Sequence, residues 1–127
     1  MNYVLTRDPE GIWQKYENDE ERSQLRAKEN LRYLSASPAE VIEIAAADGH
    51  QELAVCGGTS VYTAFLPLVE TFYLTREPVA LGEGLRLIKD LDLNGLESML
   101  EENFALQETV TMNDQGTIRQ TWKRKKS

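Results

Sequence analysis

Two adjacent glycines, Gly57 and Gly58, lie between a short apolar segment and the expected start of a helix. Because glycine has no side chain, a ligand can approach the backbone at this point and the chain can turn sharply. The helix begins with Thr59 and Ser60, and the first turn of a helix offers unpaired N–H groups and a partial positive charge that suit a phosphate. Taken alone, such a turn is more often a tight connection without a ligand. It matches neither the Gly-x-Gly-x-x-Gly dinucleotide pattern nor a phosphate loop with its lysine.

Other side chains that could do chemistry are few. Cys56 is the only cysteine and His50 the only histidine, which excludes an intramolecular disulfide and a paired-cysteine metal site, and no metal is expected. A Cys–His nucleophile pair would need these two side chains to meet, and no third partner for them is apparent. The acidic residues between positions 17 and 21 are predicted to form a solvated face. No catalytic residue is assigned.

The composition is typical of a folded protein. The 127 residues are 41% hydrophobic and 28% charged, which predicts a single domain spanning residues 1–127 rather than disorder. No apolar run approaches the ~20 residues that cross a bilayer, and the first residues do not resemble a secretory signal. A cytoplasmic location without a membrane partner is therefore predicted. The net charge of −7 argues against a nucleic-acid partner, and the basic residues 123–126 are predicted to form a frayed, solvated terminus.

Alternating apolar and turn-forming residues predict an α/β fold. Ser37, a proline and Glu40 form a capping box that starts a helix, and Gly49 ends it. A second helix is expected at 60–66, and residues 12–30 form either a surface helix or an irregular loop. Strands are expected at residues 2–6, 31–34, 52–56 and 72–75, followed by an antiparallel hairpin of 104–112 and 117–123. This order predicts a mostly parallel sheet with a C-terminal antiparallel hairpin.

Several motifs, in order along the chain, resemble the dihydrofolate reductase family. An apolar strand, the Gly-Gly turn and a Val-Tyr pair occupy residues 55–62, and a Phe-Leu-Pro sequence at 65–67 precedes a Tyr-Leu-Thr strand at 72–75. The opening residues 2–9 resemble the strand that borders the family's adenosine site. Residues 77–88 resemble the riboflavin-biosynthesis reductase branch, where a Pro-Val and a Gly-x-Gly precede an apolar pair. The resemblance spans nearly the whole chain.

This resemblance implies a three-layer, dihydrofolate reductase-like fold and an NADPH-dependent oxidoreductase that acts on a pterin or a ribosylaminopyrimidine. Thr6 and Arg7 would lie beside the adenosine ribose, where a guanidinium can pair with the 2′-phosphate and favour NADPH over NADH. Thr75 would support a substrate-binding carboxylate. The remaining cofactor-side residues implied by the resemblance are Cys56, Gly57, Gly58, Thr59, Ser60, Val61 and Tyr62.

Simpler alternatives exist for three of these side chains. Arg7 could be a solvated turn residue, Tyr62 a core residue, and Cys56 a small buried hydrophobe. In the family, the strand that matches residues 2–6 follows an opening third with the first strand, the mobile loop and the substrate-binding carboxylate. No counterpart of that third precedes Met1, so an N-terminally truncated form is expected, and truncation could abolish activity.

Two further interpretations of the whole chain remain open. The first is a catalytically silent nucleotide-binding or oligomerisation module, in which a homodimer could cover the sheet edge left by the missing strands. The second is an unrelated α/β domain with a chance Gly-Gly turn.

Overall fold

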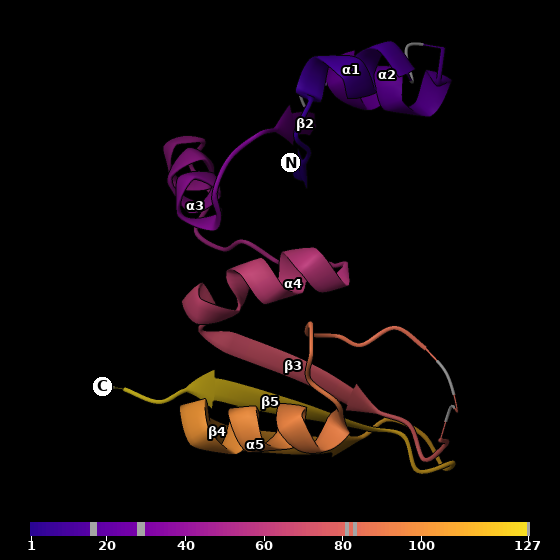
Figure 1. The fold of residues 1–127 in the computed structure, drawn as a ribbon, viewed down its shortest axis with the longest axis vertical. Helices are drawn as coiled ribbons and strands as arrows, with labels where there is room; N and C mark the ends of the chain where they lie inside the picture. Colours follow the sequence, from indigo (N-terminus) through magenta and orange to yellow (C-terminus); the bar gives the residue numbers. More distant parts are fainter. Residues whose placement is uncertain (16–17, 28–29, 81, 83, 127) are drawn as a thin grey trace. The chain divides into compact units, whose positions relative to one another are not determined.

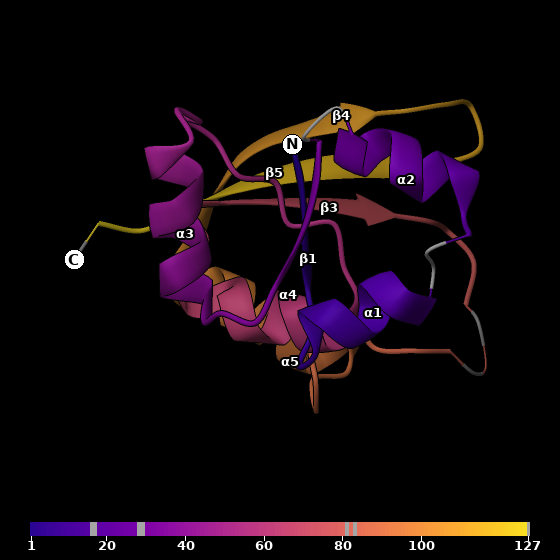
Figure 2. The same cartoon turned by 90° about the horizontal axis from the view of Figure 1, so that it is seen from above.

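The computed structural model describes residues 1–15, 18–27, 30–80, 82 and 84–126. The fold is mixed α/β, with helices and two small sheets, one parallel and one antiparallel. The chain divides into two compact units, Met1–Leu53 and Ala54–Ser127, which Figures 1 and 2 show from two directions. Within the described ranges, no helix is long and apolar enough to cross a membrane.

The first unit contains a two-stranded parallel sheet. Strand β1 (Asn2–Leu5) pairs with β2 (Leu31–Leu34) in register, so that Asn2 lies opposite Leu31. Two helices connect these strands, α1 (Pro9–Lys15) and α2 (Glu20–Ala27). Much of the segment 12–30, for which the sequence allowed either a helix or an irregular loop, is therefore helical. Asp8 starts α1 by accepting a hydrogen bond from the Gly11 N–H at 3.0 Å, because short acidic side chains satisfy free N–H groups at helix starts.

Helix α3 (Pro38–Ala47) follows β2 and has the predicted ends. The Ser37 hydroxyl accepts from the Glu40 N–H, and the Glu40 carboxylate accepts from the Ser37 N–H at 3.1 Å. This capping box is therefore confirmed. Gly49, with φ of +90°, follows the helix in the left-handed conformation that favours glycine.

The second unit is built on an antiparallel three-stranded sheet. Helix α4 (Thr59–Phe65) continues into the short 3-10 helix η1 (Leu66–Leu68) and leads to strand β3 (Thr71–Arg76). Helix α5 (Leu93–Asn103) then precedes β4 (Phe104–Thr111) and β5 (Ile118–Arg124). The strand order is β3-β5-β4, so the last strand lies in the centre. The predicted C-terminal hairpin is confirmed.

Helix α5 packs on one face of this sheet and forms the core with it. Its buried Leu96 and Leu100 meet Leu74 of β3 and Phe104 at the start of β4, and the Phe72 and Phe104 rings lie edge to face, 6.1 Å apart. The remaining side chains that pack against this cluster come from α4, from η1 and the segment after it, from the loop before α5, and from α5 and β5: Tyr62, Leu66, Val69, Leu91, Met99 and Trp122.

The prediction of a strand at residues 52–56, and with it that of a mostly parallel sheet, is wrong for the described structure. No residue from 52 to 58 is in a strand, and the strands form one parallel and two antiparallel pairs. Apolar and β-branched residues suit a pleated surface, but they form a strand only where a neighbouring strand pairs with their backbone. Within the described ranges, no strand pairs with this segment.

The prediction of a frayed basic terminus is also wrong for residues 123–125. Arg124 is half-buried in β5, and its guanidinium donates to the backbone carbonyls of Val69 and Leu66. The Lys123 ammonium donates to Thr71 at 2.8 Å, and that of Lys125 donates to the carbonyl of Glu101 at 2.7 Å. These cations find carbonyl and hydroxyl acceptors because β5 runs beside β3 and the end of α5.

Candidate functional site

The predicted glycine turn has a half-buried Gly57 and an exposed Gly58, with an aromatic ring beside Gly57. Gly57 has φ of +114°, a conformation that favours glycine. The peptide bond between Gly57 and Gly58 is cis. A Cβ atom added at Gly58 would have no atom within 4 Å, whereas one added at Gly57 would lie 3.4 Å from the Tyr62 hydroxyl. The turn therefore has open space on the side of Gly58 and the Tyr62 ring beside Gly57.

Helix α4 is joined to the segment 86–89 by two threonine side chains. The Thr59 hydroxyl donates to the Arg86 carbonyl. The Thr63 hydroxyl donates to the Thr59 carbonyl at 2.7 Å and accepts from the Lys89 N–H at 2.9 Å. The hydroxyl of Thr59 is thus engaged within the protein, whereas Ser60, the next residue of the helix, is exposed.

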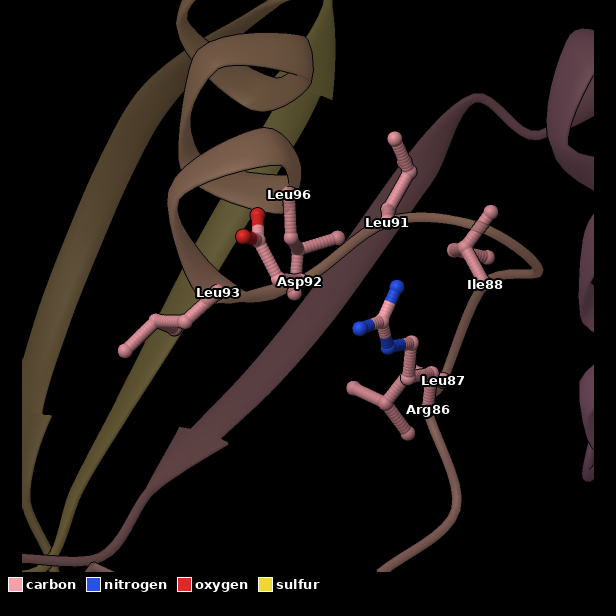
Figure 3. A pocket seen from close by; sticks show the side chains of 7 residues that line it. All are labelled: Arg86, Leu87, Ile88, Leu91, Asp92, Leu93 and Leu96. Atoms are coloured by element: carbon pink, nitrogen blue, oxygen red, sulfur yellow. The ribbon is translucent and has the colours of Figure 1, made fainter.

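The same segment lines an open apolar cavity of about 190 Å³. Figure 3 shows the side chains that line it, with leucine and isoleucine side chains from the loop before α5 and from the first turn of that helix. Arg86 and Asp92 are the charged residues of the lining, and the Asp92 carboxylate also caps α5 by accepting from the Gly95 N–H at 2.8 Å. The complete lining is Arg86, Leu87, Ile88, Leu91, Asp92, Leu93 and Leu96.

Tyr62 and Cys56 have different surroundings. Tyr62 is half-buried and packs against the core of the second unit, so it is a core residue in addition to lying beside Gly57. Cys56 is exposed, and its thiol points to the Ala54 carbonyl with a sulfur–oxygen distance of 3.8 Å. The alternative that Cys56 is a small buried hydrophobe is therefore wrong. Val61, the next predicted residue, is half-buried on α4.

Thr75 lies on β3, directly across from Arg119 of β5, and is exposed. Thr6 and Arg7 belong to the first unit, in the segment after β1. The Thr6 N–H donates to the Leu34 carbonyl at 2.9 Å, and its hydroxyl accepts from the Asp8 N–H at 3.3 Å. Arg7 is exposed. Of the predicted site residues, the structure thus joins the seven at 56–62 into one turn and helix, and it places Thr6 and Arg7 in the other unit.

The first unit also carries a cluster of polar side chains around Asp48, at the end of α3. The Tyr3 hydroxyl donates to the Asp48 carboxylate at 2.6 Å, and Arg32 pairs with the same oxygen at 2.8 Å. The His50 ring lies edge-on to Tyr3, with the ring centres 6.3 Å apart. The hydrogen bond from Tyr3 and the charge of Arg32 lower the pKa of Asp48, whereas burial and the bond to Asp48 raise the pKa of Tyr3. These contacts join the end of α3 to the parallel sheet.

Two features near the predicted site are not identified from the sequence. The first is the apolar cavity, together with helix α5, which was not predicted from the sequence; Asp92 before a Leu-x-x-Leu sequence is a helix-start signal that could have identified it. The second is Arg119, whose position opposite Thr75 depends on strand register. In the described part of the chain, no three His, Cys, Asp or Glu side chains come together in a way that could hold a metal ion.

The comparisons with known proteins identify no family. No protein-family model matches the chain, and no curated protein matches it either.

Proposed function

We propose that this chain is the cofactor-binding part of an NADPH-dependent reductase of the dihydrofolate reductase or riboflavin-biosynthesis reductase type. The substrate is a pterin or a ribosylaminopyrimidine. The observation that carries the proposal is the Gly57–Gly58 turn, which has open space beside the exposed Gly58 and the Tyr62 ring beside Gly57. It lies among motifs whose order along the chain resembles that family.

The backbone of the turn supplies the phosphate contacts in this proposal. The space beside Gly58 is large enough for a phosphate, because a Cβ atom added at this position would have no atom within 4 Å. The exposed Ser60 can add a hydroxyl donor, while Thr59 keeps the start of α4 fixed to the segment around Arg86. NADPH, when bound, supplies a hydride. The role of Tyr62 is to border the nicotinamide side of the site and exclude water from it.

Arg7 is assigned to the choice between cofactors. Its guanidinium is exposed and carries a permanent charge, and a 2′-phosphate offers the planar donor fork several oxygen acceptors. We further propose that the chain has a three-layer, dihydrofolate reductase-like fold and that it acts in the cytoplasm. The single cysteine fits a reducing compartment.

The test is calorimetric titration of the purified, folded protein with NADPH and separately with NADH. The proposal predicts saturable NADPH binding, weaker NADH binding, and loss of both in Gly58→Val, whose side chain fills the open space. Gly84→Val is the matched control because a Cβ atom at Gly84 also has nothing within 4 Å. Arg7→Gln should weaken the binding of NADPH but not that of NADH. Absence of NADPH binding, or equal loss in Gly58→Val and Gly84→Val, would refute the proposal.

A catalytically silent module that oligomerises is the second candidate. It is favoured by the parallel sheet of the first unit, in which β1 and β2 pair with no other described strand, because two-stranded sheets are marginally stable alone. This candidate predicts a concentration-dependent dimer in analytical ultracentrifugation and no oxidation of NADPH with either substrate class. Turnover with dihydrofolate or with a ribosylaminopyrimidine would exclude it.

A further inference from the structure

Arg119 has a buried nitrogen without a hydrogen-bond partner. The residue lies in β5, the central strand of the antiparallel sheet, and is half-buried. Its Nε atom is buried, and no acceptor for it is present among the described residues. An arginine side chain stays charged at all ordinary pH values, and a buried donor on a charged group is costly to leave unpaired. Among the described residues, the Nε atom of Arg119 thus lacks the acceptor that such a group normally has.

Two other arginines of the same sheet show how such groups are normally satisfied. Arg76 pairs with Glu97 of α5 at 2.5 Å, and Arg124 donates to two backbone carbonyls. Arg76 lies opposite Ile118, one position before Arg119, and Arg124 is five positions after Arg119 on β5. Because successive side chains of a strand point to opposite faces, both arginines lie on the other face of the sheet from Arg119, the face that α5 covers. Arg119 lies on the opposite face.

The side chains around Arg119 are mostly hydrogen-bonding groups. Thr75 of β3 lies directly across from it and is exposed, and Thr121 follows it on the same face of β5. Tyr73, next to Thr75 on this face, has 66% of its surface exposed. Val110 is the neighbour on β4. A guanidinium beside two threonine hydroxyls is a donor set that suits a carboxylate or phosphate oxygen.

The acidic side chains of this face do not neutralise Arg119. The Glu77 carboxylate accepts from the Thr117 hydroxyl at 2.7 Å. Glu108 is exposed and lies opposite Thr121. In the part of the chain that the structure describes, neither forms an ion pair with Arg119.

We propose that Arg119, with Thr75 and Thr121, forms an oxyanion-binding site on the open face of the antiparallel sheet. The exposed Tyr73 ring beside it suits an aromatic group that carries the anion. The ligand is then a heterocycle bearing a phosphate ester or a carboxylate. That this ligand is the substrate rests on the proposed reductase function, whereas the anion site itself does not.

Side-chain NMR of the full chain tests the site directly. The Arg119 Nε–H signal is assigned by its loss in Arg119→Lys, and the wild-type protein is titrated with inorganic phosphate and separately with acetate. A saturable shift of this signal is expected. A stronger response to phosphate indicates a phosphate ester, and a stronger response to acetate indicates a carboxylate. In Arg119→Gln, which lacks this signal, binding is followed through the backbone amide signals of Thr75 and Thr121, and it should be weaker by about 10-fold to 100-fold.

Two controls separate this site from others. Arg86→Gln removes an exposed arginine of the same unit and should leave anion binding unchanged. Gly58→Val should abolish NADPH binding without changing the Arg119 response. An Nε–H signal that stays unmoved by both anions overturns the proposal. If the signal responds while NADPH fails to bind, the anion site stands and the proposed reductase function fails.

Discussion

Arg124 should be a major source of stability in the second unit, contrary to what its place in a basic terminus indicates. Its Nε donates to the Val69 carbonyl at 2.7 Å and its Nη2 to the Leu66 carbonyl at 2.5 Å. The guanidinium also lies over the Phe104 ring, with the guanidinium carbon 4.6 Å from the ring centre. One side chain thus joins the end of α4, the start of β3 and the core.

The expected loss follows from these contacts. A hydrogen bond to a charged group contributes about 1.5–3 kcal/mol, and leaving a buried acceptor unpaired has a similar cost. Because Arg124 is half-buried, water can replace part of each hydrogen bond, and we take the net contribution of each bond to the free energy of unfolding as about 1 kcal/mol. The contact with the Phe104 ring adds about 1 kcal/mol. Replacement of Arg124 by Met, which keeps an apolar stem, should lower the free energy of unfolding by about 3 kcal/mol.

Urea unfolding followed by the fluorescence of Trp122 measures this loss. Trp122 packs against the core of the second unit, and replacement of Trp13 by Phe in every variant leaves it as the only tryptophan. The matched control is Lys126→Met, because Lys126 is exposed and belongs to the same basic run. Equal unfolding midpoints for Arg124→Met and Lys126→Met would refute the reasoning. Such a result would mean that the arginine contacts contribute nothing net.

Three further predictions concern other contacts. Ser37→Ala removes the capping box with Glu40 and should destabilise α3 by about 1 kcal/mol, measured by amide hydrogen exchange in the first unit. Thr117→Val removes a buried hydroxyl that donates to a glutamate at 2.7 Å, and it should cost about 1–3 kcal/mol in urea unfolding. The pKa of Asp48 is lowered, mainly by the bond from Tyr3, so its stabilising effect is present above its ordinary pKa and is lost as pH falls through the lowered value. Stability measured against pH should therefore fall in acid, and Asp48→Asn should make that fall shallower.

Each of these predictions has a control. Ser35→Ala replaces an exposed serine before the same helix and should leave hydrogen exchange unchanged, so equal effects of the two changes would contradict the cap. Thr109→Val replaces an exposed threonine of β4 and should cost little. An acid response of Asp48→Asn that equals the wild type would show that the contact with Tyr3 does not contribute to stability.

The sequence determined the features that depend on neighbouring residues. Ser37 and Glu40 define a helix start by themselves, because a capping box involves only four consecutive positions. Gly49 similarly ends the helix through its own backbone freedom. The C-terminal hairpin follows from alternating residues around a turn in which the Asn113 side chain accepts from the Gln115 N–H at 2.9 Å. The glycine turn at Gly57 and the helix after it are local features as well.

Only the tertiary structure decided the features that depend on distant partners. Residues 52–56 have the composition of a strand but no described strand to pair with, so propensity alone did not make them one. The sheet order β3-β5-β4 brings Arg119 opposite Thr75 and Arg124 beside Leu66, pairs separated by more than forty positions. Register and long-range contacts leave no local signal. The chemistry of a charged side chain could therefore be recognised from the sequence, but whether it meets water, a carbonyl or no partner at all was set by the fold.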